Sequence, residues 1–506
     1  MPSSTSPRAS VSSVDLTLTG PAKLAEVTKL MDTLAADLEK IALLPHQRDA
    51  ILEQVKIFGR DPSNSDPIFT NEASHFSSLY IYRTDDSQGI ETLTRHAFNS
   101  PSLTTSRNAL RCLANALLLK PETRQILVDL DYSQKACLKL KNDSRDDEFL
   151  VSRIIFLTTY NTNLNLEKLV DQYHLAEYIC QNLGRHAKQY TTKHGNKKPA
   201  QDNPMEDMAL IETAKLMFNT THHCPQRIGA FSPALQPILI LLTKREVSST
   251  KPLEPPIGSL INALLNVTLD EKDNIALLFP KSSSNINVDR FVEILEKGVN
   301  FYEDDELEHN VSPILQLLRK IYEFAPKDVQ IHLQNALLPT EEDRKQILGR
   351  TETLSSKLLR FTSNPTTPQV RESISTLFFD LSSKDPKIFV QNVGYGFASG
   401  FLFQHNVPIP ENALEAWSTG SESSKERASQ DSINLAGRIN PVTGQFLDME
   451  EKHEEVEMTL EEKEREAEKL FVLFERLKKT GVMNVQNPVE KAFHEGRFEE
   501  LPDDHE

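Results

Sequence analysis

Long hydrophobic runs and secretion signals are missing from this 506-residue chain. The longest uninterrupted apolar stretch, 237–243, is far shorter than the roughly 18 residues that a membrane-spanning helix needs. Residues 1–14 are rich in Ser and Pro and contain no apolar core, so no signal peptide is visible. We therefore expect a cytoplasmic protein with no integral membrane segment.

Cysteine is scarce, and none of the four residues has a CxxC spacing: Cys112, Cys137, Cys180 and Cys224. They lie in or beside helix-like apolar runs, which indicates packed, reduced thiols in a reducing compartment. His222 and His223 precede the last of them, but no second ligand pair follows at the spacing of a structural zinc site. We expect a helix-end cluster here, with no metal and no cofactor.

Signatures of covalent catalysis are also missing, since neither GxSxG nor HExxH occurs. Gly394, Gly396 and Gly400 superficially resemble a dinucleotide-binding loop, but no strand–helix–strand unit surrounds them. Helix breaking and close packing explain these glycines better. The chain is not expected to be an enzyme.

Positive charge is in deficit, with a net charge of −17. Residues 448–506 hold 19 acidic and 9 basic residues, so −10 falls in this tail and −7 in the rest. This balance argues against nucleic-acid binding, which requires Lys and Arg to neutralise phosphates. A local basic groove within an acidic protein remains open.

Helical periodicity is abundant, whereas alternating strand patterns are scarce. Near the N-terminus, apolar residues recur at three- and four-residue spacing: Leu24, Val27, Leu30, Leu34, Leu38 and Ile41. This spacing places one apolar stripe on a helix. The predicted fold class is all-α.

A weak repeat indicates the architecture. Six apolar stripes end in a polar residue, in segments 108–115, 151–158, 214–219, 260–266, 314–323 and 374–380. The terminal polar residues are 43, 61, 47, 57 and 57 residues apart, against roughly 40–47 for armadillo and HEAT units. The polar loop 186–204 accounts for the longest interval. Stacked repeats would form a superhelix with a concave face, and an irregular helical bundle is the alternative.

The predicted boundaries follow composition. A disordered tail (1–20) precedes an armadillo/HEAT-like solenoid (21–416). A flexible linker (417–457) carries a turn-rich docking segment at 438–444. An amphipathic helix (458–481) and an acidic tail (482–506) complete the chain.

The helix at 458–481 has clear sequence signals. Thr459 and Glu462 have the spacing of a capping box, and Gly481 suits a helix end. One face is apolar, with Ala467, Leu470, Phe471, Phe474 and Leu477. Since a linker separates this face from the core, we expect it to dock on a partner.

Three asparagines, Asn115, Asn219 and Asn266, close apolar stripes at corresponding positions. Such a ladder would line the concave groove of a solenoid and bond a guest, although each amide could instead cap its own helix. Arg111 lies four residues before Asn115 and would share its face.

Lys56 and Arg60 are also four residues apart, at a predicted helix end. An ordinary solvated basic pair is one interpretation. If they face the groove, they would attract a guest's terminal carboxylate.

Several segments together resemble a known family. Residues 458–480 resemble the C-terminal helix of synembryns, and Ile-Asn-Pro-Val-Thr-Gly at 439–444 is similar to a short signature of that family. Segments 55–61, 109–117 and 255–266 resemble family helices. On these motifs the chain is identified as a member of the synembryn (resistance to inhibitors of cholinesterase 8) family, of fungal type.

The resemblance implies a guanine-nucleotide exchange factor and folding chaperone for G-protein α subunits (Gα), monomeric and recruited to the membrane cortex through Gα. It assigns a groove for the Gα C-terminal helix to Lys56, Arg60, Arg111 and Asn115, and the asparagine ladder adds Asn219 and Asn266 to this predicted groove. It assigns a clamp on the Gα nucleotide domain to Leu470, Phe471, Phe474 and Leu477.

The resemblance also implies phosphorylation of an acidic linker. Thr419 and Ser423 have an acidic residue three positions on, although this linker is less acidic than the family pattern. A solenoid adaptor without exchange activity is the alternative function.

Overall fold

The computed structural model describes residues 17–69, 88–191, 204–408, 439–440, 442–450, 465 and 469. Across these residues the protein is helical, and the isolated bridge between Ile439 and Phe446 is the one β feature. The all-α prediction is therefore confirmed. None of the described helices combines the length and apolar character that crossing a membrane would require.

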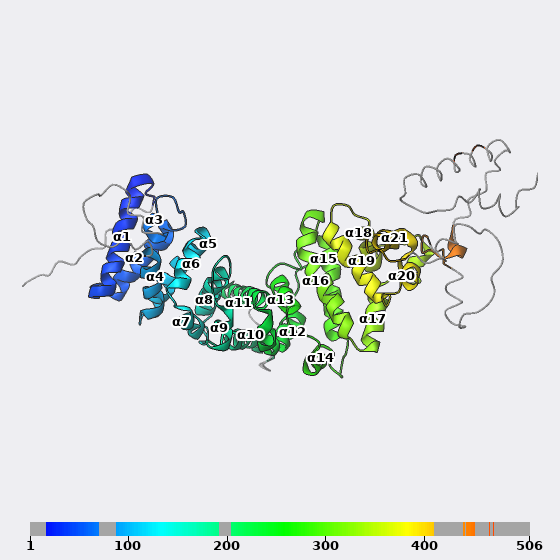
Figure 1. Cartoon of the computed structure of the whole chain (residues 1–506), viewed down its shortest axis with the longest axis horizontal. Helices are drawn as coiled ribbons and strands as arrows, with labels where there is room; N and C mark the ends of the chain where they lie inside the picture. The colour runs from blue at the N-terminus through cyan, green and yellow to red at the C-terminus, as the bar shows by residue number, and fades with distance from the viewer. Residues whose placement is uncertain are drawn as a thin grey trace, which may run out of the picture. The chain divides into compact units, whose positions relative to one another are not determined.

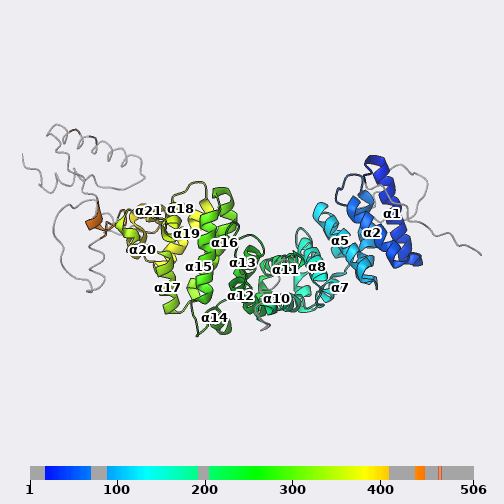
Figure 2. The same ribbon diagram turned by 180° about the vertical axis from the view of Figure 1, so that it is seen from behind.

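The chain forms two compact units. Unit 1 comprises 1–336 and 364–377, and unit 2 comprises 337–363 and 378–506. The helices of unit 1 (Figures 1 and 2) are α1 (Gly20–Lys40), α2 (Pro45–Phe58), α3 (Asp66–Phe69), α4 (Gln88–Asn99), α5 (Leu103–Leu119), α6 (Thr123–Asp129), α7 (Ser133–Lys139), α8 (Arg145–Thr158), α9 (Leu166–Asp171), α10 (Leu175–Thr191), α11 (Pro204–His223), the 3₁₀ helix η1 (Pro225–Ala234), α12 (Leu235–Lys244), α13 (Ile257–Leu265), α14 (Lys272–Leu278), α15 (Ile286–Phe301) and α16 (Asp304–Phe324).

Two helices cross the division between the units, α17 (Lys327–Leu337) and α19 (Pro368–Leu381). Unit 2 holds η2 (Asp343–Lys345), α18 (Leu354–Thr362), α20 (Pro386–Val393), α21 (Tyr395–Gln404) and η3 (Leu447–Met449).

The six repeated segments of the sequence all lie in helices, namely α5, α8, α11, α13 (with its C-cap), α16 and α19. Within unit 1, α2 packs on α5, α5 on α8, α8 on α11, α11 on α13 and α13 on α16. Consecutive apolar stripes therefore bury one another, as the repeat pattern requires.

A second row of helices accompanies the first. Helix α1 packs on α4 and α4 on α6, and further along the chain α10 packs on α12 and α12 on α15. Contacts of α4 with α5, α10 with α11, α12 with α13 and α15 with α16 join the two rows. Figures 1 and 2 show this succession from opposite sides.

Local sequence starts several helices. A side-chain oxygen accepts a first-turn N–H from the residue preceding α5, α8, α9, α18 and α20, namely Ser102, Ser144, Asn165, Thr353 and Asp385. These caps satisfy amides that a helix leaves unpaired at its N-terminus. In α8 the cap is followed by Asp146, Asp147 and Glu148, whose charge suits the helix dipole.

The cysteines are free, as predicted, and Cys112, Cys137 and Cys224 are buried. Burial raises the pKa of Cys112, Cys137 and Cys180 to about 12. These thiols therefore act as small apolar side chains of the core.

In unit 2, the described residues of 439–450, which we call the strap, pack beside the start of α21 (orange in Figure 1). Gly394 has φ +79°, and a Cβ there would lie 3.1 Å from the Val442 carbonyl oxygen. The Gly396 N–H donates to the same oxygen at 3.1 Å. Close packing, as predicted, explains Gly394, whereas a Cβ at Gly396 would make an ordinary contact of 3.4 Å with the same oxygen and one at Gly400 would meet nothing within 4 Å.

A buried ionic cluster joins α8, α10 and α11. The ring of His186 lies between two carboxylates, with Nε2 2.8 Å from Glu148 and Nδ1 2.6 Å from Glu206. Arg145 bonds the second oxygen of each carboxylate at 2.7 Å. Thr213 also donates to Glu148 at 2.8 Å. Two cations thus balance two anions, with Glu148 and His186 buried and Arg145 and Glu206 half-buried.

The titration of this cluster follows from its geometry. Burial acts to lower the pKa of His186, but its hydrogen bonds to Glu148 and Glu206 outweigh burial, and the pKa is raised above 6.5. Burial acts to raise the pKa of Glu206, but the hydrogen bond and charge of His186 and the Arg145 guanidinium bring it down to about 2.

We expect His186→Ala to lower the free energy of unfolding by about 3 kcal/mol, because the buried carboxylate of Glu148 and the half-buried carboxylate of Glu206 lose the cation between them. A raised histidine pKa stabilises fully below about pH 6.5, and this contribution is lost as the pH rises through the folded-state pKa. The difference from wild type should therefore be largest near pH 6 and shrink in alkaline solution. Urea unfolding across pH measures it.

His332 supplies the matched control, since its pair with Asp289 at 2.5 Å lies at the surface. His332→Ala should cost about 1 kcal/mol or less. Equal losses of unfolding free energy in the two variants, or a His186→Ala effect that does not vary with pH, would contradict a protonated His186 between the two carboxylates.

Candidate functional site

Two adjoining cavities in unit 1, of about 320 and 810 Å³, share Phe218, Asn262 and Pro313. We call them together the groove. Residues of α11, α13 and α16 line both. The first is also lined by Phe156, Tyr160, Lys215, Asn219, Leu253, Pro255, Gly258, Ser259, Ile261, His309 and Asn310, and the second by His222, Leu265, Asn266, Leu315, Gln316, Arg319, Lys320, Glu323, Glu372, Ser373 and Thr376.

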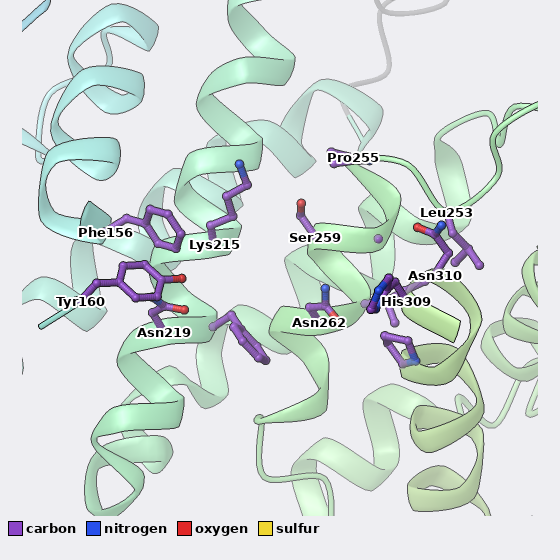
Figure 3. A pocket seen from close by; sticks show the side chains of 14 residues that line it. Phe156, Tyr160, Lys215, Asn219, Leu253, Pro255, Ser259, Asn262, His309 and Asn310 are labelled. Carbon is purple, nitrogen blue, oxygen red and sulfur yellow. The ribbon is translucent and has the colours of Figure 1, made fainter. Parts of the chain in front are cut away.

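Helical spacing brings these side chains onto one face. Phe156 and Tyr160 lie four residues apart at the end of α8, as do Lys215 and Asn219 on α11 and His309 and Pro313 on α16. In Figure 3 Phe156, Tyr160, Lys215 and Asn219 lie on one side of the cavity, with Asn262, His309 and Asn310 on the other.

The walls present aromatic surface. The rings of Phe156 and Tyr160 meet edge to face, with centroids 5.2 Å apart, and Phe218 stacks on His222 at 6.0 Å. The Lys215 ammonium lies 6.0 Å from the centre of the Phe156 ring. Such surfaces can receive apolar side chains of a guest.

The charged side chains at the groove pair with other groups of unit 1. Glu212, buried on α11, pairs with Arg153 at 3.2 Å and with Lys215 at 3.3 Å. Lys320 donates to the Leu265 and Val267 carbonyls at 2.8 and 2.7 Å, next to the C-terminus of α13. Burial lowers the pKa of Lys320.

Backbone chemistry adds an acceptor at the wall. Pro313 has no N–H, so the carbonyl of His309 lacks the donor that a helix normally supplies four residues on. Both residues line the first cavity.

Two of the predicted groove residues, Asn219 and Asn266, do line the groove. Their amides brace neighbouring helices. Asn219 donates to the Thr159 hydroxyl at 2.8 Å, and Asn266 donates to the Phe218 carbonyl at 3.3 Å and the Thr221 hydroxyl at 3.1 Å. These bonds run between helices. The alternative that the sequence left open was that each asparagine caps its own helix.

Lys56 and Arg111 lie where α2 packs on α5, and both act electrostatically on the buried thiol of Cys112. Lys56 pairs with Glu53 on its own helix. Arg111 bonds Asp146 of α8 at 3.2 Å.

Arg60 and Asn115 differ from these two. Among the residues that the structure describes, neither side chain makes a hydrogen bond or an ion pair, and Arg60 is exposed. They are thus available to a guest in the described part of the chain.

The remaining predicted residues lie outside the described residues: Leu470, Phe471, Phe474, Leu477, Thr419 and Ser423. Their roles stay predictions.

Sequence reasoning missed the aromatic wall and the cations Lys215, Arg319 and Lys320. A signal was present, since Phe156 and Tyr160 stand four apart at the polar end of an apolar stripe, as do Phe218 and His222. Within the described ranges, no group of three or more His, Cys, Asp or Glu side chains could hold a metal ion. The arrangement of aromatic walls, amides and cations suits an amphipathic helix.

Fold and groove together define an all-helical protein with an aromatic-walled groove in unit 1. The family model described as "Guanine nucleotide exchange factor synembryn" matches residues 51–497. The chain belongs to the synembryn family.

Three relatives are similar to this chain over more than half of its length. A synembryn-like chaperone of Schizosaccharomyces pombe is 30% identical over 313 residues, which cover 60% of this chain and 57% of that protein, so the match spans little more than half of the yeast protein. Chaperone Ric-8A of Macaca fascicularis is 26% identical over 479 residues, covering 90% of this chain and 85% of that protein. Chaperone Ric-8A of Mus musculus is 24% identical over 475 residues, with the same coverage.

The two classes of asparagine should respond differently to truncation. Asn219→Ala removes a buried bond between helices and should lower the free energy of unfolding by roughly 1–2 kcal/mol. Asn115→Ala, which removes no described bond, should change it by less than about 0.5 kcal/mol. Denaturant unfolding of the two variants side by side measures this, and equal effects would contradict the distinction.

Proposed function

We propose that the protein is a guanine-nucleotide exchange factor and folding chaperone for heterotrimeric G-protein α subunits. The observation that carries the proposal is the family match over 51–497, because it covers both units. The names of the relatives, which are chaperones, support the second activity.

In this proposal the two rows of unit 1 are an armadillo/HEAT-type superhelix, and the guest's C-terminal helix lies in the groove. The aromatic wall takes its apolar side chains, and Asn219 and Asn266 shape the floor by bracing α11 against its neighbours. Lys56, Arg60, Arg111 and Asn115 attract the end of the guest helix. Arg60 and Asn115, which have no described partner, make the direct contacts.

Exchange requires no acid or base. A protein that binds nucleotide-free Gα more tightly than its GDP form weakens GDP binding by the same factor, because linkage is reciprocal. A thousandfold weakening needs about 4 kcal/mol of differential binding. Withdrawing the guest's C-terminal helix into the groove would supply it by disturbing the base-binding loop attached to that helix.

Chaperoning uses the same contacts. A partly folded Gα exposes apolar surface, and the groove, together with the predicted clamp at Leu470, Phe471, Phe474 and Leu477, would cover it. The protein would act in the cytoplasm and reach the membrane cortex through Gα.

The test is stopped-flow release of fluorescent GDP from purified Gα. We expect the full-length protein to raise the release rate about tenfold or more, with saturation as its concentration passes the affinity for Gα. An adaptor would bind and leave the rate unchanged, and that outcome would reject the exchange activity.

The assignment of Arg111 and Asn115 to guest binding has its own test. Arg111→Ala combined with Asn115→Ala should weaken binding of a Gα C-terminal peptide about tenfold or more, because charge and amide contacts are lost together. Fluorescence anisotropy with a labelled peptide measures this.

Arg227→Ala is the matched control. Its pair with Asp171, at 2.8 Å, is exposed to a degree similar to the pair of Arg111 with Asp146, and Arg227 has no assigned role in guest binding. The peptide should bind this variant as it binds wild type. Unaltered affinity in the double variant would show that the assigned face is wrong.

A further inference from the structure

The strap is a self-closed turn. The Asn440 N–H donates to the Gln445 carbonyl and the Gly444 N–H to the Asn440 carbonyl, both at 2.8 Å. The Asn440 side chain accepts the Val442 and Thr443 N–H groups at 2.8 and 3.3 Å. These bonds give the strap a defined shape of its own.

Unit 2 holds the strap through backbone groups from two places. From the loop around η2, the Leu348 N–H donates to the Thr443 carbonyl at 3.3 Å, and the Arg344 carbonyl accepts the Phe446 N–H at 2.8 Å. From the start of α21, Gly396 donates to Val442, as described above.

The Arg344 side chain, from η2, bonds both the strap and α20. Its guanidinium donates to the Gly444 carbonyl at 3.0 Å and to the Asn392 carbonyl, in α20, at 2.9 Å. The side chain is buried, and burial lowers its pKa. Within the described residues Arg344 forms no ion pair, so these carbonyls are what compensate its desolvation.

The neighbouring Asp343 fixes the loop that carries Arg344. Its carboxylate accepts hydroxyl bonds from Thr340, Thr351 and Thr353 at 2.9, 2.6 and 2.6 Å. Burial acts to raise the pKa of Asp343, but these bonds lower it to about 2. The guanidinium is therefore presented from a rigid support.

The strap occupies a particular place in the chain. Thirty residues, 409–438, separate it from residue 408, four residues beyond the end of α21, and residues 451–506, which contain the predicted clamp, follow it. Among the described residues, the hydrogen bonds of the strap are what fix the start of this last segment on unit 2.

We propose that Arg344 is a positioning residue for nucleotide exchange: by holding the strap, it anchors to unit 2 the segment that acts on the Gα nucleotide domain. This rests on the proposed function. The anchoring is non-covalent and does not depend on the chain connection through 409–438. Binding of the guest helix in the groove of unit 1 does not require the anchored strap.

The first experiment cuts the connection. A protease site placed within 409–438 of the full-length protein should, after cleavage, leave both fragments co-eluting from a sizing column. The nicked protein should release labelled GDP from Gα at the wild-type rate within about twofold. Separation of the fragments would overturn the proposal.

The second experiment releases the strap. Arg344→Met removes both guanidinium bonds. Gly444→Ala acts from the strap side, because Gly444 has φ +70° and its added Cβ would lie 2.3 Å from Leu348 Cδ1. For each variant we expect faster hydrogen exchange at 439–450 and GDP release slowed about tenfold, with the affinity for the Gα C-terminal peptide unchanged within about twofold.

Arg360→Met is the control, since Arg360 also donates to two backbone carbonyls of unit 2, those of Gly349 and Thr351, and not to the strap. This variant should leave the rate of GDP release and the hydrogen-exchange protection of 439–450 unchanged. A variant with a freed strap and normal GDP release would overturn the proposal, as would parallel losses of peptide binding and exchange. If wild type itself failed to accelerate release, the proposed function would fall, while co-elution and hydrogen exchange would still decide whether Arg344 anchors the strap.

Discussion

The buried carboxylate of Glu148 sets the condition under which α8 packs on α11. Left alone, a charge in that position would oppose the contact by several kcal/mol. His186, Arg145 and Thr213 neutralise and bond it, and they come from α10, α8 and α11. The aromatic wall at the end of α8 and the amide and ammonium groups of α11 lie on the same side of the groove, and the contact between the two helices holds them together there. The groove therefore depends on an interaction whose residues do not line it.

Short-range pattern predicted most of the fold. Each of the six apolar stripes lies in a helix, because burial of one face at a 3.6-residue period is a local property of the chain. The sequence also indicated the helix break at Gly394, because glycine readily adopts the positive φ that the chain has there. The division into two units cuts across α17 and α19 and follows contacts between distant residues, so the sequence carried no visible sign of it.

The site was predicted less completely, because the sequence does not show which distant side chains bond one another. Asn219 reaches Thr159 across 60 residues, and Arg111 meets Asp146 across 35. A spacing rule can place a side chain on a face but cannot say which distant group it will meet there. Asn115 and Arg60, by contrast, were assigned from position alone and have no described partner. Arg344 gave no signal at all, because its role lies in carbonyls 48 and 100 residues away.

The groove and the strap lie in different units, so the roles proposed for them in binding and in exchange predict effects that substitutions would separate. Family membership joins them, since the matched region includes both. The groove is built from side chains of one row of helices, whereas the strap is held mainly through backbone groups. Substitutions that change side chains in the groove would therefore alter recognition more readily than anchoring.

The raised pKa values of the buried thiols have a practical consequence. At neutral pH a thiol with a pKa of about 12 has about a thousandfold less thiolate than an ordinary surface cysteine, and the thiolate is the form that reacts. A cysteine introduced on an exposed helix would therefore take up a maleimide dye far faster than Cys112, Cys137 or Cys180. Fluorophores could be attached at chosen points without first removing these three native cysteines.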